Sequence, residues 1–479
     1  MFLVWLLAVP LAGAIATLLA SAKGAKVVAA ITSFVALVGY AGLLFVNRAG
    51  VNWPWISAWG VRFHLEADGL GLFLLGLNAV LFVVAILASS EEMGRVYYFW
   101  LLLLEFSVAG LFAAVDLFVF YVFWEVLLIP VFFLLTQWSG ARGKAAALKW
   151  LIMNLVGSFF LLVGIVAVAV IHHQNGGAFT FEISALSGMT LPAGAATWLF
   201  VAFLVAFWIK APLWPLHGWM PDAYGESPAP VTALISGVLS KAGIYGILRV
   251  MMPLFLPQFR QFQLVLLILA AIGLLYGALA ALRQNDMKMV TAYGSLSHMA
   301  MMALGIFSLT EVGILGTTYY MVAHGLMVGG LFIVLGLLES RTGTRTIQDM
   351  AGLNKSAPRL AAYFLFFVLG ALGLPGLPGF VGEYMIIQGL IQSQVVFAVV
   401  AGFVLVVAAW YMLRVFQAVM QGPAKGSAIR DLLARQVAWL VPLAGLVVFI
   451  GLWPAGITSH AAPSLYHVTH FLAGKGGGQ

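Results

Sequence analysis

Six ionisable side chains lie near the middle of long apolar runs in this 479-residue chain, in which only 8% of residues are charged. A charge at the centre of a bilayer costs roughly 2.5–3.5 kcal/mol even on insertion scales, so such groups face the protein interior and indicate function. Two acids, two lysines and two histidines at similar depth form a row of groups that can exchange protons. They are Glu125, Lys210, Lys241, His298, His324 and Glu383.

The two lysines suit proton exchange in different ways. A carboxylate that moves or changes charge can switch a buried lysine between holding and releasing a proton, which fits a pair made of Glu125 and Lys210. The alternative is a structural ion pair, although buried pairs are weak stabilisers. Lys241 has no acid near it in sequence, which makes its proton easier to lose. We therefore expect Lys241 to be the central proton carrier.

Other polar residues give weaker signals. His298 and His324 could each be a hydrogen-bonded packing residue, although neutral imidazole is also a natural relay element. Glu105, in the middle of another apolar run, is a further candidate. Asp222 and Glu226 either guard an entry path or are simply solvated, and the sequence favours neither.

The composition defines the class of protein. With 63% hydrophobic residues, the chain is a polytopic membrane protein, and apolar runs of about 20 residues without period-two alternation predict membrane-spanning helices. The absence of cysteine excludes iron–sulfur clusters, thiolate metal sites and disulfides. The net charge of +7 lies in loops and does not indicate nucleic-acid binding.

Fourteen spans are expected, and the first is read as a true helix rather than a cleaved signal peptide. Their predicted ranges are Phe2–Ala20, Val27–Val46, Leu70–Ser89, Tyr97–Ala114, Leu117–Gln137, Trp150–Ile171, Trp198–Met220, Ala229–Met252, Phe262–Leu282, Val290–Leu309, Val312–Leu338, Leu360–Leu390, Val395–Met420 and Val437–Trp453.

The basic residues alternate between loops in a way that supports this count. Every second loop is basic, and together these loops hold fifteen of the 23 Lys and Arg residues. Only Arg48, Arg62, Arg260 and Lys475 fall on the opposite side. By the positive-inside rule the basic loops are cytoplasmic, so both termini are expected outside.

Two of the predicted spans are interrupted by proline and glycine. The breaks fall at 210–217 (KAPLWPLH) in span seven and at 373–379 (GLPGLPG) in span twelve. Broken spans at matching places in two halves indicate an inverted-repeat transporter. The spacing agrees, because Glu125 to Lys210 and His298 to Glu383 both span 85 residues. No residue-level repeat accompanies this spacing.

Several stretches resemble the antiporter-like subunits of respiratory complex I and their relatives in multisubunit cation/proton antiporters. They cover spans four to thirteen almost continuously: 116–130 (DLFVFYVFWEVLLIP), 210–224 (KAPLWPLHGWMPDAY), 226–230 (ESPAP), 240–245 (SKAGIY), 292–298 (AYGSLSH) and 377–383 (LPGFVGE). Within the family the chain is most similar to the M-type members. Glu383 in span twelve, the run at 140–149 (GARGKAAALK) and a tail of about 25 residues carry that similarity.

The resemblance implies a domain organisation and a role for each site residue. It implies N-terminal helices over 1–92, a first inverted five-helix repeat over 93–255, a second over 256–421, and helix 14 with a short tail over 422–479. It also implies that Glu125 and Lys210 are a modulating pair, with Lys241 and His298 as the central connection. His324 and Glu383 then lie toward the outlet.

The function implied is that of a proton-translocating subunit of a NADH:quinone oxidoreductase, a translocase whose redox chemistry occurs in other subunits. No cofactor and no metal are expected on this chain. The expected partners are the homologous L- and N-type subunits, other complex I subunits and membrane lipid, in a bacterial inner membrane, with no nucleic acid. The alternatives are a subunit of a Na⁺(K⁺)/H⁺ antiporter or related membrane-bound hydrogenase, and a purely structural membrane scaffold.

Overall fold

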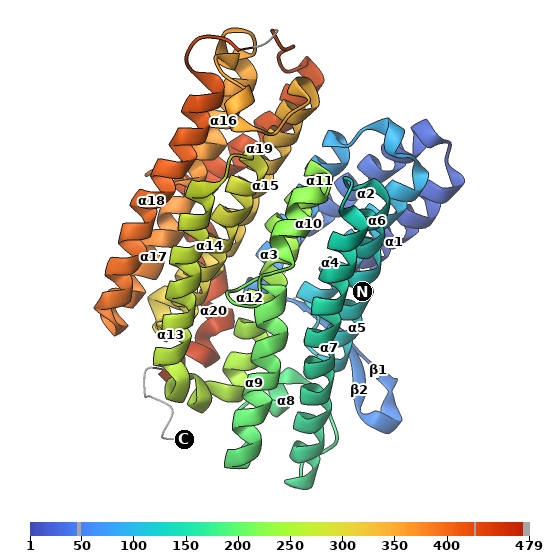
Figure 1. Cartoon of the computed structure of the whole chain (residues 1–479). Coiled ribbons are helices and arrows are strands. Elements are labelled where there is room, and N and C mark those ends of the chain that lie inside the picture. Colours follow the sequence, from blue (N-terminus) through green and yellow to red (C-terminus); the bar gives the residue numbers. More distant parts are fainter. Residues whose placement is uncertain (46–48, 426–427, 473–479) are drawn as a thin grey trace.

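A computed structural model describes residues 1–45, 49–425 and 428–472 of the chain. Within these residues, long helices run side by side in one bundle, and a single β-hairpin lies at one end (Figure 1). The predicted all-α membrane fold is confirmed apart from that hairpin. The helices are α1 (Phe2–Leu19), α2 (Ala22–Leu43), α3 (Gly69–Ala88), α4 (Arg95–Ala113), α5 (Leu117–Val126), α6 (Leu128–Trp138), α7 (Gly143–Gln174), α8 (Ile183–Leu186), α9 (Ala193–Lys210), α10 (Met220–Glu226), α11 (Ala229–Leu234), α12 (Lys241–Gly246), α13 (Met252–Arg283), α14 (Met287–Phe307), α15 (Glu311–Thr342), α16 (Pro358–Ala371), α17 (Pro378–Ser393), α18 (Val395–Met420), α19 (Ala434–Leu452) and α20 (Ala455–Leu472).

Twelve helical stretches of the described residues are long and apolar enough to cross a membrane. The predicted fourteen spans differ from these twelve at two places. Ala229–Arg283 is one 55-residue stretch that holds predicted spans eight and nine, with non-helical backbone angles at Phe255. Predicted span twelve is divided into α16 and α17, of 14 and 16 residues. The count of fourteen, the inverted repeats and the domain boundaries stay predictions.

The two breaks expected at proline are confirmed. In span seven, α9 ends at Lys210 and α10 begins at Met220, with Pro221 in its first turn. In span twelve, α16 ends at Ala371 and α17 begins at Pro378. Proline lacks the backbone donor and clashes with the preceding turn, so it ends one helix and is tolerated at the start of the next.

Two further interruptions occur in spans that were expected to be regular. Span five divides into α5 and α6 at Leu127, one turn before Pro130. Span eight contains two π-helical segments, η3 (Ile235–Leu239) and η4 (Ile247–Met251), on either side of α12. Segments of π-helix are rare and occur often at functional sites. The expectation of a regular helix is therefore wrong at both places.

The hairpin and the C-terminal helix also differ from expectation. Strands β1 (Ala49–Ile56) and β2 (Val61–Ala67) pair antiparallel at the lower end of the bundle in Figure 1. The expected short tail forms α20, which packs on α3 and α15 and is tied by a 2.9 Å bond from the Gly69 amide to Ser464 Oγ. Arg48 and Lys475, two of the four basic residues expected outside, lie beyond the described residues.

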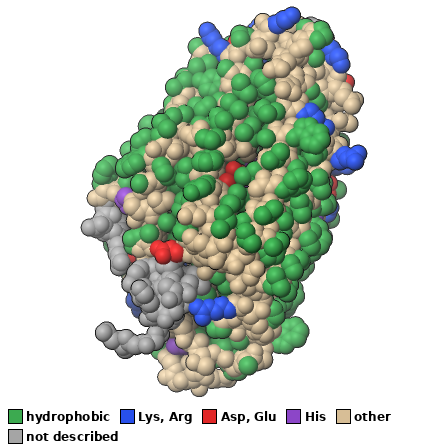
Figure 2. All heavy atoms as spheres, turned by 90° about the vertical axis from the view of Figure 1, so that its left-hand side faces the viewer, with side chains coloured by type: hydrophobic (Ala, Val, Ile, Leu, Met, Phe, Trp, Pro, Cys, Tyr) green, Lys and Arg blue, Asp and Glu red, His purple; other side chains and the backbone are tan. Residues whose placement is uncertain are grey.

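The outer helices present apolar faces, and α14 and α15 form the centre of the bundle. Nearly every residue of α15 from Gly313 to Leu338 is buried. Apolar side chains cover the middle of the face shown in Figure 2, and most of its visible basic side chains lie toward the upper end. One exposed stripe on α18 illustrates the pattern: Val395, Val399, Phe403, Val406 and Trp410. We call the end of the bundle that carries Arg142, Arg283 and Arg341 the basic end.

Candidate functional site

Lys241 and His324 form the closest contact among the predicted site residues. Lys241 Nζ lies 2.6 Å from His324 Nδ1 and 2.6 Å from the backbone oxygen of Ser236, and both side chains are fully buried. Lys241 is the first residue of α12, and only Ser240 separates it from the π-helical segment η3. The ammonium can therefore donate to imidazole and to a carbonyl at the same time, which is the geometry that proton transfer between the two groups needs.

His298 faces the same histidine from the neighbouring helix. The ring centroids of His298 on α14 and His324 on α15 lie 5.3 Å apart, with the rings perpendicular. Within the described residues, His298 Nδ1 and Nε2 and His324 Nε2 are buried without a hydrogen-bond partner. Buried polar atoms of this kind are typical positions for bound water, and water between the rings would connect them.

Glu383 joins this group through a tyrosine that the sequence analysis missed. Tyr320 donates a 2.7 Å hydrogen bond to Glu383 Oε1, and its ring centroid lies 6.1 Å from the ring centroids of both His298 and His324. Tyr320 precedes His324 by one helical turn, and that spacing was the signal in the sequence. We call Lys241, His298, Tyr320, His324 and Glu383 the central cluster.

Lys210 and Glu125 lie apart from the central cluster in a different environment. Lys210 Nζ lies 4.7 Å from the ring centroid of Trp124 and 5.7 Å from that of Trp150. The described part of the chain gives Lys210 no ion pair and its Nζ no hydrogen bond. Glu125 Oε1 is likewise buried without a partner there. The alternative of a direct structural ion pair between Glu125 and Lys210 is therefore wrong.

Three other acids flagged in the sequence lie elsewhere. Glu105 on α4 is fully buried and accepts a short hydrogen bond from Ser33 on α2. Asp222 pairs with Lys149 at 2.7 Å, and Glu226 pairs with Arg142 at 3.1 Å. Because Lys149 and Asp222 are both about half exposed, that pair fits the solvated alternative. No group of three or more potential ligands that could hold a metal ion occurs in the residues described.

Comparison with known proteins identifies the family of the chain. Residues 114–409 match the family described as "NADH:quinone oxidoreductase/Mrp antiporter, TM". The chain is 35% identical over 428 residues to NADH-quinone oxidoreductase subunit M of Pseudomonas aeruginosa, covering 87% of this chain and 84% of that protein. It is also 35% identical over 423 residues to the protein of the same name from Escherichia coli K12, covering 85% and 83%.

Solved structures give the same result at the level of the fold. A chain of respiratory complex I from Thermus thermophilus with bound NADH superposes with a TM-score of 0.90 and 31% identity, covering 98% of this chain and all of that one. A chain of the Mrp complex from Dietzia sp. DQ12-45-1b superposes with a TM-score of 0.88 at 21% identity, covering 98% of both, which shows a shared fold. This chain belongs to the family of NADH:quinone oxidoreductase and Mrp antiporter membrane subunits.

Proposed function

We propose that the chain is a proton-translocating membrane subunit of NADH:quinone oxidoreductase that holds no redox centre itself. The observation that carries the proposal is the buried contact between Lys241 and His324, continued by Tyr320 and Glu383. An ammonium, an imidazole, a phenol and a carboxyl in one buried group can each hold or release a proton. A packing role would not require such groups at this depth, where each is costly.

The geometry suggests an order for the transfer. Lys241 gives a proton to His324 Nδ1, and His324 releases one from Nε2 toward His298. Tyr320 then connects the histidines to Glu383, since its hydroxyl donates to the carboxyl and can accept a proton in turn. Lys210, held against two tryptophan rings, acts on Lys241 through its charge, and Glu125 sets that charge in turn.

The setting in the membrane follows the same proposal. The basic end faces the cytoplasm by the positive-inside rule, so both termini lie outside a bacterial inner membrane. The L- and N-type subunits and lipid cover the apolar outer faces. The chain needs no cofactor and no metal for this role, because every step in the central cluster is a proton transfer between side chains.

Replacing His324 tests this function in membrane vesicles. His324→Ala in the assembled complex is expected to lower NADH-driven proton uptake at least about tenfold, because acid–base groups typically contribute that much or more. His173→Ala, a substitution at an exposed histidine near the end of α7, is the control and should keep parental uptake. Parental uptake in an assembled His324→Ala complex would refute the proposal.

A second candidate function is exchange of Na⁺ or K⁺ for protons, because the matching family includes Mrp antiporters. The two functions differ in what drives proton movement. We expect proton uptake to require NADH oxidation. We also expect it to be the same in buffer with sodium and potassium and in buffer without them. Proton movement driven by a Na⁺ or K⁺ gradient without NADH, and lost in His324→Ala, would favour the antiporter.

A further inference from the structure

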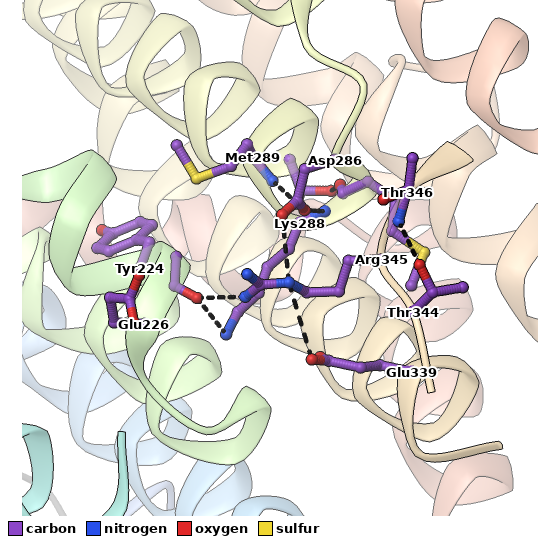
Figure 3. Close-up of polar contacts among 12 residues, drawn as sticks. Tyr224, Glu226, Asp286, Lys288, Met289, Glu339, Thr344, Arg345 and Thr346 are labelled. Carbon is purple, nitrogen blue, oxygen red and sulfur yellow. Dashed lines mark hydrogen bonds and ion pairs between the residues drawn. The ribbon is translucent and has the colours of Figure 1, made fainter. Parts of the chain in front are cut away.

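A polar cavity opens at the basic end of the bundle. Its volume is about 650 Å³, and it is lined by residues of the α10–α11 turn, the start of α14 and the end of α15. Figure 3 shows the charged side chains that converge there: Arg345 lies between Asp286 and Glu339, and Lys288 lies beside it. None of these residues belongs to the central cluster.

Lys288 reaches from the first turn of α14 to the α10–α11 turn. Its side chain is 3% exposed, and its ammonium donates to the backbone oxygens of Ser227, in a short contact, and Gly225, at 3.4 Å. Within the described chain, no carboxylate pairs with Lys288. A buried ammonium that contacts only carbonyl groups costs free energy, so its position calls for a physical reason.

Arg345, three residues after the end of α15, contacts the same turn. Its guanidinium donates to the Gly225 oxygen at 2.5 Å and pairs with Asp286 at 3.2 Å. Asp286 in turn caps α14 by accepting from the amide of Lys288 at 2.8 Å. The last carbonyls of a helix lack intrahelical donors, and at the end of α10 two cations, Lys288 from α14 and Arg345 from the segment after α15, are among the donors to them. We call Lys288 and Arg345 the carbonyl clamp.

The contacts on the other side of α10 are more exposed. Asp222 pairs with Lys149, whose side chain is 48% exposed, and Glu226 pairs with Arg142, whose side chain is 79% exposed. Exposed pairs of this kind hold little, because water and salt screen them. The contacts of the carbonyl clamp are therefore the more buried charged contacts at this turn, beside the backbone bond from Gly140 to Glu226 and the hydroxyl bonds of Thr232.

Buried hydroxyl groups continue from the clamped turn to Lys241. Ser227 Oγ lies 2.7 Å from Thr232 Oγ1, and Ser236 Oγ lies 2.9 Å from Ser295 Oγ on α14. Thr232, Ser236 and Ser240 follow at intervals of four residues, which places them along one face of the helix. The carbonyl of Ser236, the middle residue of the three, accepts a hydrogen bond from Lys241.

We propose that Lys288 and Arg345 are positioning residues that hold the α10–α11 turn, so that Ser236 and Lys241 stay in register with His324. The clamp links the start of α14 and the segment after α15, the two helices that carry the histidines, to the helix that carries Lys241. This inference rests on the proposed proton-translocating function.

Variants of Lys288 separate positioning from proton transfer. Lys288→Met keeps the length of the side chain and removes its donors, so proton uptake per NADH oxidised should fall about threefold or more. Lys288→Arg keeps charge and donors but does not release its proton, so it should retain most uptake if the residue positions the turn. Lys425→Met is the matched control, since exposed Lys425 also donates to a carbonyl, that of Gln348 at 3.2 Å.

A thiol probe detects the turn directly, because the chain has no cysteine. Val231→Cys places a thiol on α11 at a fully buried position behind the clamp. A water-soluble maleimide should label it slowly in an otherwise parental complex and several times faster when Lys288→Met is added. Arg345→Gln, at a side chain that is 32% exposed, should raise labelling in the same direction by a smaller factor.

The outcomes are distinguishable from a failure of the proposed function. If His324→Ala keeps parental uptake, the proposed function is wrong and the clamp loses its role with it. If His324→Ala abolishes uptake while Lys288→Met keeps it, only the clamp proposal is overturned. Equal loss in Lys288→Arg and Lys288→Met overturns it too. Should Lys288→Met not assemble, unchanged labelling in Arg345→Gln overturns it.

Discussion

Lys210 and Lys241, the two buried lysines among the six predicted site residues, have very different surroundings. Lys241 lies 2.6 Å from an imidazole nitrogen and from a carbonyl oxygen, whereas Lys210 lies over the faces of Trp124 and Trp150. An aromatic face stabilises a cation but neither accepts a proton nor passes one on. This difference supports the proposed roles, in which Lys241 transfers protons and Lys210 acts through its charge.

The local backbone reinforces this difference. Lys210 is the last residue of α9, where the helix dipole favours a cation by about 0.3–1 kcal/mol. Lys241 follows the π-helical segment η3, and the Ser236 carbonyl within η3 accepts hydrogen bonds from the Lys241 ammonium and the Ser240 hydroxyl. A broken helix end thus favours the charged form of Lys210, while a π-helical segment supplies a hydrogen-bond acceptor to Lys241.

The largest effect that would test this comparison is expected at Lys241. Both Lys241→Ala and Lys241→Arg should lower NADH-driven proton uptake about tenfold or more, because guanidinium keeps the charge but hardly releases a proton. The measurement is proton uptake by both variants in one type of membrane preparation, with Lys355→Ala at an exposed lysine as the control. Full rescue by arginine would show that Lys241 is only a fixed counter-charge.

Glu125 should give the next largest effect, because it acts through the charge of Lys210. Glu125→Ala is expected to leave the complex assembled and to lower proton uptake about fivefold or more, as coupling between charged sites typically does. Glu125→Asp keeps the carboxylate and should be partly tolerated. Glu311→Ala, at an exposed acid that begins α15, serves as the control. Parental uptake in Glu125→Ala would remove the modulating role.

Tyr320 should give a smaller effect within the central cluster. Tyr320→Phe removes the hydroxyl that bonds to Glu383 and leaves a buried carboxyl without that partner, so proton uptake should fall about threefold. Tyr319→Phe is a close control, because it removes the hydroxyl of the neighbouring tyrosine, which donates to the Ile450 carbonyl at 2.8 Å. Equal loss in both variants would indicate a packing effect rather than a place for Tyr320 in the transfer.

Much of this arrangement could be predicted from the sequence, because charges inside apolar runs and prolines inside predicted helices are local signals. They located the six ionisable residues and both broken spans. The break beside Glu125 was also visible, since the ring of Pro130 clashes with the carbonyl four residues earlier, at Val126, where α5 ends. Strand β2 of the hairpin could also be predicted, because Val61, Phe63 and Leu65 alternate with polar residues.

Other features had no local signal. No residue type in the sequence marks the π-helical segments on either side of Lys241. The contacts of Lys210 with Trp124 and Trp150 were not predicted either, because these two residues cannot be told from the other tryptophans in a chain that has 15. Contacts between helices that are far apart in sequence decide which buried lysine has a hydrogen-bonding partner and which packs on an aromatic ring.

The smallest predicted effect concerns the ring beneath Lys210. Trp124→Leu removes the aromatic face and should lower proton uptake about twofold to threefold, because a buried cation–π contact is worth roughly 1–2 kcal/mol and Trp150 remains. Trp124→Phe keeps a face and should retain more activity. Both variants lose the 3.1 Å hydrogen bond from Trp124 to Ser158, so the difference between them isolates the ring.

The control for Trp124 lies on the same helix as the lysine. Trp198 on α9 is 76% exposed on the outer face, so Trp198→Leu should leave proton uptake at the parental value. If Trp124→Phe and Trp124→Leu lose uptake equally, the ring does not act through its face, and the Ser158 bond or packing explains the loss. If neither loses uptake while Glu125→Ala does, the charge of Lys210 needs no aromatic support, and the contrast between the two lysines rests on the Lys241–His324 contact alone.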